Sequence, residues 1–120
     1  MGKRKENSTN LENEKYINDC ELTYSLNIVS GRWKMLILCR LSYGIHRFGK
    51  LRDGIRGVTE RMLTLQLREL EQDGLVKRTV YAEVPPRVEY ELTEIGKELV
   101  EIWQPLNSWG IKHKQLFGKL

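Results

Sequence analysis

The stretch VTERMLTLQLRELEQDG, residues 58–74, decides the fold of this chain. Its large apolar side chains recur at helical spacing and share one face: Leu63, Leu67 and Leu70, with Met62 beside them. Thr59 can cap the first turn through its hydroxyl, and Gly74 can adopt the left-handed conformation that ends a helix. We therefore predict an amphipathic helix from Thr59 to Asp73 with its leucine face buried.

The opposite face of this helix is polar and basic. Four of its residues recur at helical spacing and a fifth lies one turn further on: Arg61, Thr64, Leu65 and Arg68, then Gln72. Arginine pairs bidentately with guanine edges or phosphate, threonine can bond either, and an exposed leucine can pack on a thymine methyl group. Taken alone, the stripe is also compatible with a solvated helix face stabilised by charge pairs.

Basic residues are concentrated around this helix. The whole chain has a net charge of +4, and residues 44–68 contain six basic residues against two acidic ones, which leaves the rest of the chain balanced. The six are Arg47, Lys50, Arg52, Arg56, Arg61 and Arg68. A basic surplus confined to one segment is typical of a face that binds nucleic acid, with chance clustering as the alternative. On a DNA-binding face, we expect Lys50 and Arg52 to hold phosphates.

The bulk composition indicates one domain. A length of 120 residues, with 40% hydrophobic and 30% charged residues, is typical of a single soluble domain. We assign residues 16–120 to it and residues 1–15, which are polar and lack periodicity, to a flexible arm. No apolar run is long enough to cross a membrane and no signal peptide is visible, so we expect a cytoplasmic protein. Cys20 and Cys39 form neither a disulfide framework nor a zinc motif, so reduced thiols are expected.

Three helices are predicted ahead of the decisive one. The first covers residues 22–29, and the second, over residues 33–42, is strongly apolar, with Cys39 as a small core residue. The third is short, and its apolar residues are Phe48, Leu51 and Ile55. Residues 45–47 between them are too few for more than a turn or a short strand. A short helix, a glycine-containing turn and a longer helix with an outward basic stripe form the pattern of a helix-turn-helix.

Beyond Gly74 the apolar period changes from helical to two. Residues 76–81 and 87–92 largely alternate between apolar and polar, as in strands with one buried face, and we predict that they pair as a hairpin. Their connection, residues 82–86, contains two consecutive prolines, which lack amide donors. We therefore expect a stiff projecting loop with Arg87 at its base.

The last predicted helix begins at Thr93, which can cap it, and Pro105 interrupts it, where we expect a kink. It carries a wide apolar stripe: Leu99, Ile102, Trp103, Leu106 and Trp109. This stripe is large for the end of a small domain. Either it folds back on the core or it packs against the same helix of a second copy, and we favour the second alternative.

These elements describe a winged helix domain, and the local sequences resemble the HxlR family of bacterial and archaeal transcription regulators. The resemblance covers roughly residues 20–109. It is carried by GRWK at 31–34, RFGKLR at 47–52, MLT at 62–64, LRELE at 67–71, DGLV at 73–76, VPPRVEY at 84–90, LTEIG at 92–96 and Cys20 eleven residues before Gly31. The chain departs from the family pattern at Glu21, where proline is usual, and at Leu65, where a polar residue is usual.

The resemblance implies an α+β, mainly helical fold, namely a winged helix-turn-helix with a two-stranded β wing and N- and C-terminal dimerisation helices. It implies a homodimeric regulator of double-stranded DNA, which we expect to act as a repressor. The dimerisation residues we assign are Leu22, Leu26, Trp103, Leu106 and Trp109. Two recognition helices related by a twofold axis predict an inverted-repeat operator.

The DNA contacts follow from the two-faced helix. We assign Arg61 and Arg68 to base or phosphate contacts and Leu65 to an apolar one, with Thr64 and Gln72 as supporting polar contacts. Arg87 is expected to enter the adjacent minor groove, whose negative potential is strongest at A-tracts.

Some members of the family sense oxidants or electrophiles through the cysteine that Cys20 matches, which makes a small reactive inducer an expected partner. Cys20 precedes the helix that begins near Leu22, where free backbone amides favour the reactive thiolate, whereas Asp19 and Glu21 oppose it. The alternative is a half-buried structural cysteine at the dimer interface. Cys39, in an apolar helix, is expected to stay protonated and inert.

An enzyme is the main alternative from another class of function. His46 and His113 belong to no metal or general-base motif, and the chain has no phosphate loop or nucleophile elbow. We therefore predict no enzymatic activity, no cofactor and no metal. A winged helix used only to bind another protein is a third alternative, against which the outward basic stripe argues.

Overall fold

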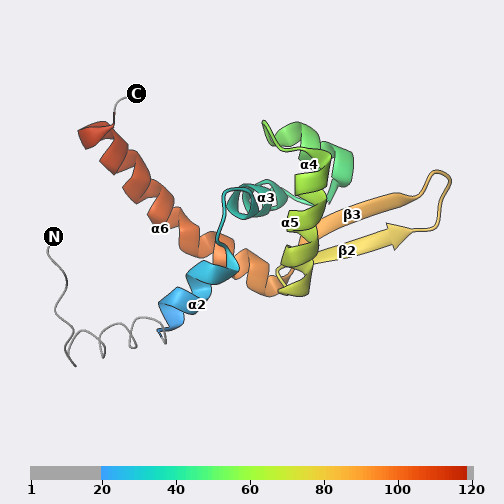
Figure 1. Ribbon diagram of the computed structural model, residues 1–120, viewed down its shortest axis with the longest axis horizontal. Coiled ribbons are helices and arrows are strands. Elements are labelled where there is room, and N and C mark those ends of the chain that lie inside the picture. The colour runs from blue at the N-terminus through green and yellow to red at the C-terminus, as the bar shows by residue number, and fades with distance from the viewer. Residues whose placement is uncertain (1–19, 119–120) are drawn as a thin grey trace, which may run out of the picture. The chain divides into compact units, whose positions relative to one another are not determined.

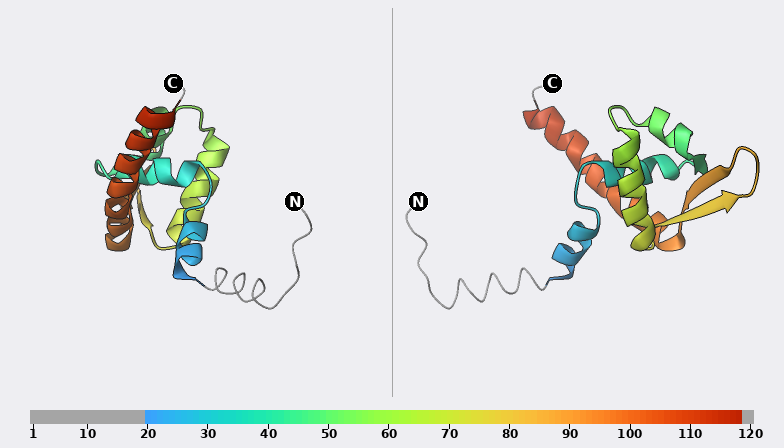
Figure 2. Two further views of the ribbon diagram at one scale, coloured as in Figure 1. Left: turned by 90° about the vertical axis from the view of Figure 1, so that its left-hand side faces the viewer. Right: turned by 45° about the vertical axis from the view of Figure 1, so that its right-hand side comes forward.

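The computed structural model describes residues 20–118, so the arm predicted over residues 1–15 lies outside the described residues. The chain divides after Gly31 into two units. The described part of the first unit contains one helix, α2 (Glu21–Ile28). The second unit contains the remaining elements, which are drawn in Figures 1 and 2.

The second unit is a winged helix-turn-helix with α+β architecture. Its elements are α3 (Trp33–Leu41), β1 (His46–Arg47), α4 (Phe48–Gly54), α5 (Glu60–Gln72), β2 (Val76–Tyr81), β3 (Arg87–Leu92) and α6 (Glu94–Phe117). This order confirms the predicted fold. The short segment 45–47 contributes β1, so the sheet has three antiparallel strands in the order β1-β3-β2 in this part of the chain.

Both ends of α5 are closed by the residues that the sequence indicates. The Thr59 hydroxyl oxygen accepts a hydrogen bond from the Met62 amide at 3.1 Å, which satisfies one of the free donors of the first turn. At the other end Gly74 has a φ of +78°, and the next amide, that of Leu75, donates to the Leu70 carbonyl at 3.0 Å. These bonds form the C-terminal motif in which a left-handed residue ends the helix.

The core lies beneath the leucine face of α5. Its fully buried side chains come from three helices: Ile37, Leu38, Leu51, Leu63, Leu67 and Leu70. The burial of the three α5 leucines confirms the predicted face, whereas Met62 is 36% exposed at its margin. One buried cation joins this core, because Lys34 on α3 pairs with Glu69 on α5 at 2.7 Å.

The helix α3 is apolar almost throughout and buries one of its faces. Its buried positions are Lys34, Ile37, Leu38 and Leu41, which follow helical spacing. Leu36 is 43% exposed, and Cys39 is exposed rather than a core residue, so that prediction is wrong. The physical reason is that Lys34 occupies a buried position, where Glu69 compensates its charge.

The hairpin of β2 and β3 has the predicted bounds and projects from the helices in Figure 1. The strands pair from Val76 opposite Leu92 to Tyr81 opposite Arg87. Near the helices Val76, Leu92 and Tyr90 are buried, and the exposed 82–86 loop connects the strands at the tip.

The helix α6 continues through Pro105, which therefore does not end it, and the kink expected there stays a prediction. Pro105 and Glu101, whose carbonyl loses its amide partner there, are both exposed, and water can therefore satisfy that carbonyl. Trp103 is only 8% exposed and belongs to the core, unlike the open stripe in which it was placed. None of the helices within residues 20–118 combines the length and the apolar character that crossing a membrane requires.

Candidate nucleic-acid interface

The outward face of α5 brings five predicted site residues together on the surface: Arg61, Thr64, Leu65, Arg68 and Gln72. Four of them, with Glu60, line a shallow hollow of about 480 Å³. Leu65 is 44% exposed, so this face also presents an apolar side chain to solvent. Neither Arg61 nor Arg68 has an ion-pair partner in the part of the chain that the structure describes. Two guanidinium groups are therefore free to bind anions or base edges from this face.

The Thr64 hydroxyl is already committed as a donor. It donates a hydrogen bond to the Glu60 carbonyl one turn earlier at 2.8 Å. A hydroxyl has one proton and two acceptor lone pairs, so Thr64 can only accept a further hydrogen bond without breaking this one. Its natural partners on a base edge are the amino groups of adenine and cytosine.

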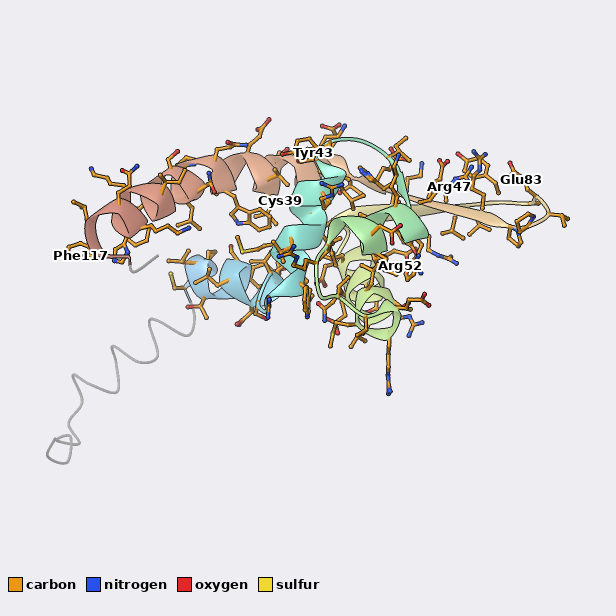
Figure 3. All side chains as sticks on the ribbon, turned by 90° about the horizontal axis from the view of Figure 1, so that it is seen from above. Cys39, Tyr43, Arg47, Arg52, Glu83 and Phe117 are labelled. Atoms are coloured by element: carbon orange, nitrogen blue, oxygen red, sulfur yellow. The ribbon has the colours of Figure 1, made fainter. Side chains whose placement is uncertain are left out.

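The two predicted phosphate contacts on α4 differ. Lys50 is exposed, whereas the Arg52 guanidinium hydrogen-bonds Glu60 Oε2 at 2.5 Å and Asp53 Oδ1 at 3.3 Å, and Figure 3 shows Arg52 on α4. Both hydrogen bonds raise the pKa of Arg52, and the bond with Glu60 contributes more than the bond with Asp53. Arg52 thus links α4 to the start of α5 across the turn, and its charge is largely compensated.

Arg87 in the wing is held in a similar way. Its guanidinium lies over the Tyr81 ring at 4.0 Å and forms ion pairs with Glu83 at 3.1 Å and Glu89 at 3.2 Å. Figure 3 shows Glu83 at the tip of the hairpin. To enter a minor groove, Arg87 would have to exchange these carboxylates for DNA.

A second hollow, of about 300 Å³, lies between α5 and the hairpin. Its lining residues are Thr64, Arg68, Glu71, Arg78 and Tyr90. Of these, Arg78 was not predicted as a site residue from the sequence. The available signal was the alternation in β2, where Arg78 takes the position between Val76 and Val80 on the face that should be apolar.

The predicted dimerisation residues, Trp103 excepted, are exposed. Leu106 and Trp109 on α6 are 53% and 61% exposed, and Leu22 and Leu26 on α2 are exposed as well. Further along α6, aromatic rings contact one another from Trp109 through His113 to Phe117, with centroids 5.2 and 5.1 Å apart. The second half of α6 extends beyond the other elements of its unit in Figures 1 and 2.

The two cysteines have different surroundings. Cys20 is the half-buried N-cap of α2, and its sulfur accepts a hydrogen bond from the Leu22 amide at 3.4 Å. Cys39 is exposed on α3 and lines a hollow together with Leu36 and Tyr43, among others. Figure 3 labels Cys39 and Tyr43. Although the residue is exposed, partial burial raises the pKa of the Cys39 thiol. Cys39 is therefore accessible, and its thiolate is scarce at neutral pH.

Comparisons with known proteins agree with this geometry. Residues 28–116 match the family model of the HxlR-like helix-turn-helix. The chain is 46% identical over 101 residues to an uncharacterised helix-turn-helix transcriptional regulator of Bacillus subtilis, YdeP, covering 84% of this chain and 79% of that protein.

Solved structures match as well. The redox regulator HypR in its reduced form superposes with a TM-score of 0.76 and 41% identity, covering 81% of this chain and 96% of that one. The reduced form of the transcriptional regulator YodB from B. subtilis has a TM-score of 0.69 and 33% identity, covering 79% and 90%. All three relatives are named as regulators rather than as enzymes.

Proposed function

The chain belongs to the HxlR-like helix-turn-helix family and is a transcriptional regulator, and on this premise we propose that the outward face of α5 reads a DNA operator in the major groove. The observation that carries the proposal is the exposed face on which Arg61 and Arg68, both without ion-pair partners in the described chain, flank Thr64 and Leu65. The helix-turn-helix α4–α5 presents such a face to a groove. A regulator of chromosomal genes acts where the DNA is, so its place is the cytoplasm of a bacterial or archaeal cell.

Each side chain on this face has a role that its chemistry allows. Arg61 and Arg68 donate to guanine edges or phosphates, and Leu65 packs on a thymine methyl group. Thr64 accepts from a base amino group, because its proton is used within the helix. Gln72 supports the contact one turn further on. Lys50 holds a phosphate, and Arg52 supports α5 through Glu60.

The experiment selects duplexes from a random-sequence library with the wild-type protein and measures variant affinities for the enriched duplex at several salt concentrations. Arg61→Ala and Arg68→Ala should each lose about 1–3 kcal/mol of specific binding. Lys97→Ala removes the same charge from α6, where Lys97 pairs with Glu94, and should bind like wild type. If both arginine variants retain wild-type affinity, or if no duplex is enriched, the assignment is wrong.

We also propose that the regulator is a homodimer joined through α6 and α2. Support comes from the exposed apolar residues Leu106 and Trp109, whose burial against a second copy removes apolar surface from water. Leu22 and Leu26 would contribute from α2. A twofold dimer presents two α5 helices to half-sites roughly 34–36 Å apart, which makes the operator an inverted repeat.

Point substitution tests the dimer better than a truncation of α6 before Trp103, because the truncation would also remove a core side chain. The double variant Leu106→Glu/Trp109→Glu alters side chains that are exposed in the single chain and should sediment as a folded monomer. Ile95→Glu, at the other end of α6 and also exposed, should remain dimeric. A double variant that still sediments as a dimer would exclude this interface.

Oxidant sensing through Cys20 is a second function that a specific observation favours. Two of the similar structures are regulators solved in a stated reduced form, and one of them is named a redox regulator. In this chain Cys20 caps α2, so its sulfur lies at the positive end of the helix dipole. Modification there would disturb α2 and, in the proposed dimer, the spacing of the two recognition helices.

Two reagents distinguish the chemistry of this response. A quinone adds to one thiolate sulfur to form a thioether, whereas diamide removes two electrons and two protons from two thiols as they form a disulfide. Cys20→Ser should abolish release from DNA by either reagent. Cys39→Ser should leave the quinone response intact, and because Cys39 is exposed it needs the same test with diamide. A quinone response that survives in Cys20→Ser would make Cys20 a structural residue.

A further inference from the structure

Three of the side chains that line the hollow between α5 and the wing can donate hydrogen bonds into it: Arg68, Arg78 and Tyr90. Arg78 and Tyr90 are direct cross-strand partners, so their side chains lie on the same face of the hairpin. The next pair on this face toward the helices is Val76 with Leu92, and both side chains belong to the core. Arg78, which is exposed, therefore marks the point where this face leaves the core, next to Arg68 on α5.

The donors of this hollow have no partners within the described residues. Neither Arg68 nor Arg78 forms an ion pair there. Tyr90 is 8% exposed, lines the hollow and has no hydrogen bond to its hydroxyl in the same part of the chain. The Tyr90 oxygen is not among the buried side-chain atoms that lack a hydrogen-bond partner, so it faces the open space of the hollow beside two guanidinium groups, where it can donate to an acceptor.

The charge of the hollow indicates which acceptor fits. Two arginines contribute two positive charges and Glu71 contributes one negative charge, which leaves a net charge of +1. A phosphodiester carries a single negative charge, whereas a free phosphomonoester carries about −1.5 to −2 at neutral pH. The monoanionic group matches the hollow, and the carboxylate of Glu71 disfavours the dianion.

We propose that this hollow binds one phosphodiester of the DNA backbone, clamped between Arg68 on α5 and Arg78 on β2, with the Tyr90 hydroxyl as a third donor. The inference rests on the proposed DNA binding by α5 and assigns to Arg78 a role that fixes the wing against the strand that α5 reads. A contact of this kind carries no sequence information, but it sets the register of the helix in the groove.

The experiment uses the duplex selected by the wild-type protein. Arg78→Ala should weaken binding about tenfold or more, the scale of a hydrogen bond to a charged group, and should lower the salt slope by about one. Arg78→Lys keeps the charge and should retain most of the slope. Tyr90→Phe should weaken binding about threefold, and Glu71→Gln should strengthen it by a similar factor.

Lys77→Ala is the matched control. It removes the same charge from the neighbouring position of the same strand, on the opposite face, where Lys77 stands across from Glu91. This variant should bind nearly like wild type with an unchanged salt slope. Thermal melting of each variant checks that the protein is folded. All of these substitutions except Tyr90→Phe alter exposed residues, so we expect the variants to fold.

Single methylphosphonate substitutions in the duplex locate the contact. The wild-type protein should lose affinity at several neutralised phosphates, because Lys50 and the α5 arginines can also contact the backbone, and at one of these positions per half-site Arg78→Ala should show no further loss. Additive losses, or an Arg78→Ala variant that behaves like Lys77→Ala, would overturn the inference.

Two further measurements separate the ways in which the inference could fail. Normal DNA binding by both Arg61→Ala and Arg68→Ala would refute the α5 proposal. Because Arg61 lies outside the hollow, loss in Arg61→Ala with none in Arg78→Ala would refute only the clamp. Exchange of chloride for inorganic phosphate at constant ionic strength should leave the affinity unchanged. Selective competition by phosphate that disappears in Arg78→Ala would show a site for a free phosphate and overturn the assignment.

Discussion

Replacing Gly96 by alanine should destabilise the protein, because α6 begins against the backbone that follows α5. A Cβ atom at Gly96 would collide with the Leu75 carbonyl oxygen and would stand 3.2 Å from the Leu75 carbonyl carbon and 3.4 Å from Thr93 Oγ1. The same Leu75 oxygen accepts a hydrogen bond from the Thr93 amide at 3.1 Å, and the Thr93 hydroxyl donates to the Gly74 carbonyl at 2.6 Å. The new methyl group can be accommodated only if this junction opens.

The magnitude follows from three contributions. Overpacking against fixed backbone costs about 1–3 kcal/mol, and weakening the Thr93–Leu75 hydrogen bond costs about 1 kcal/mol more. The higher helix propensity of alanine returns about 1 kcal/mol. The net loss is therefore about 1–3 kcal/mol, and at about 4 °C per kcal/mol for a domain of this size the Tm should fall by about 4–12 °C.

Gly110 provides the control within the same helix. A Cβ atom added there would have no neighbouring atom within 4 Å, so Gly110→Ala should gain only helix propensity, about 1 kcal/mol, and raise the Tm by about 4 °C. Calorimetry of wild type and both variants at one protomer concentration measures the difference, since association makes the Tm concentration-dependent. Equal increases in Tm for both variants would refute the close contact at Gly96.

Four other substitutions test the core and the wing. Leu67→Ala should cost about 2–5 kcal/mol of unfolding free energy in chemical denaturation, because Leu67 is 1% exposed. Glu69→Gln should cost about 1–3 kcal/mol of unfolding free energy, because it leaves the buried Lys34 ammonium without its carboxylate. Lys34→Met should cost less, because Glu69 is 42% exposed and water can hydrate its carboxylate. A larger loss for Lys34→Met than for Glu69→Gln would contradict the pairing. Glu83→Gln removes one of the two carboxylates that hold Arg87 and should raise DNA affinity a few-fold in a binding titration, and lower affinity would show that the pair is needed to hold the tip.

The elements with local signals could be predicted from the sequence. Thr59 and Gly74 mark the beginning and the end of α5, and the change of apolar period after Gly74 indicates where the hairpin starts. These signals act through neighbouring backbone atoms, so they survive without knowledge of the tertiary structure. The outward placement of Arg61 and Arg68 follows from the same helical period that buries the leucines.

The predictions that failed depend on partners distant in sequence. Cys39 was expected in the core because α3 is apolar almost throughout, and only the pair formed by Lys34 with Glu69 shows which face is buried. Trp103 was expected at a dimer surface, because the apolar stripe of α6 does not show which of its residues pack in the core and which are exposed. Neither outcome can be read from periodicity alone, because each depends on which groups lie opposite.

The ion-pair partners of the cations could not be predicted from the sequence either, and they determine which cations should contribute to DNA affinity. A sequence counts cations but not their partners, and two of the predicted DNA contacts, Arg52 and Arg87, are compensated by carboxylates in the folded chain. Replacing those carboxylates by phosphate exchanges one ion pair for another, which yields little net free energy. Arg61, Arg68 and Arg78 have no such pairs to break among the described residues, so each phosphate contact they form is a full gain. The salt dependence of binding should therefore fall on removal of these three arginines and change little on removal of Arg52 or Arg87.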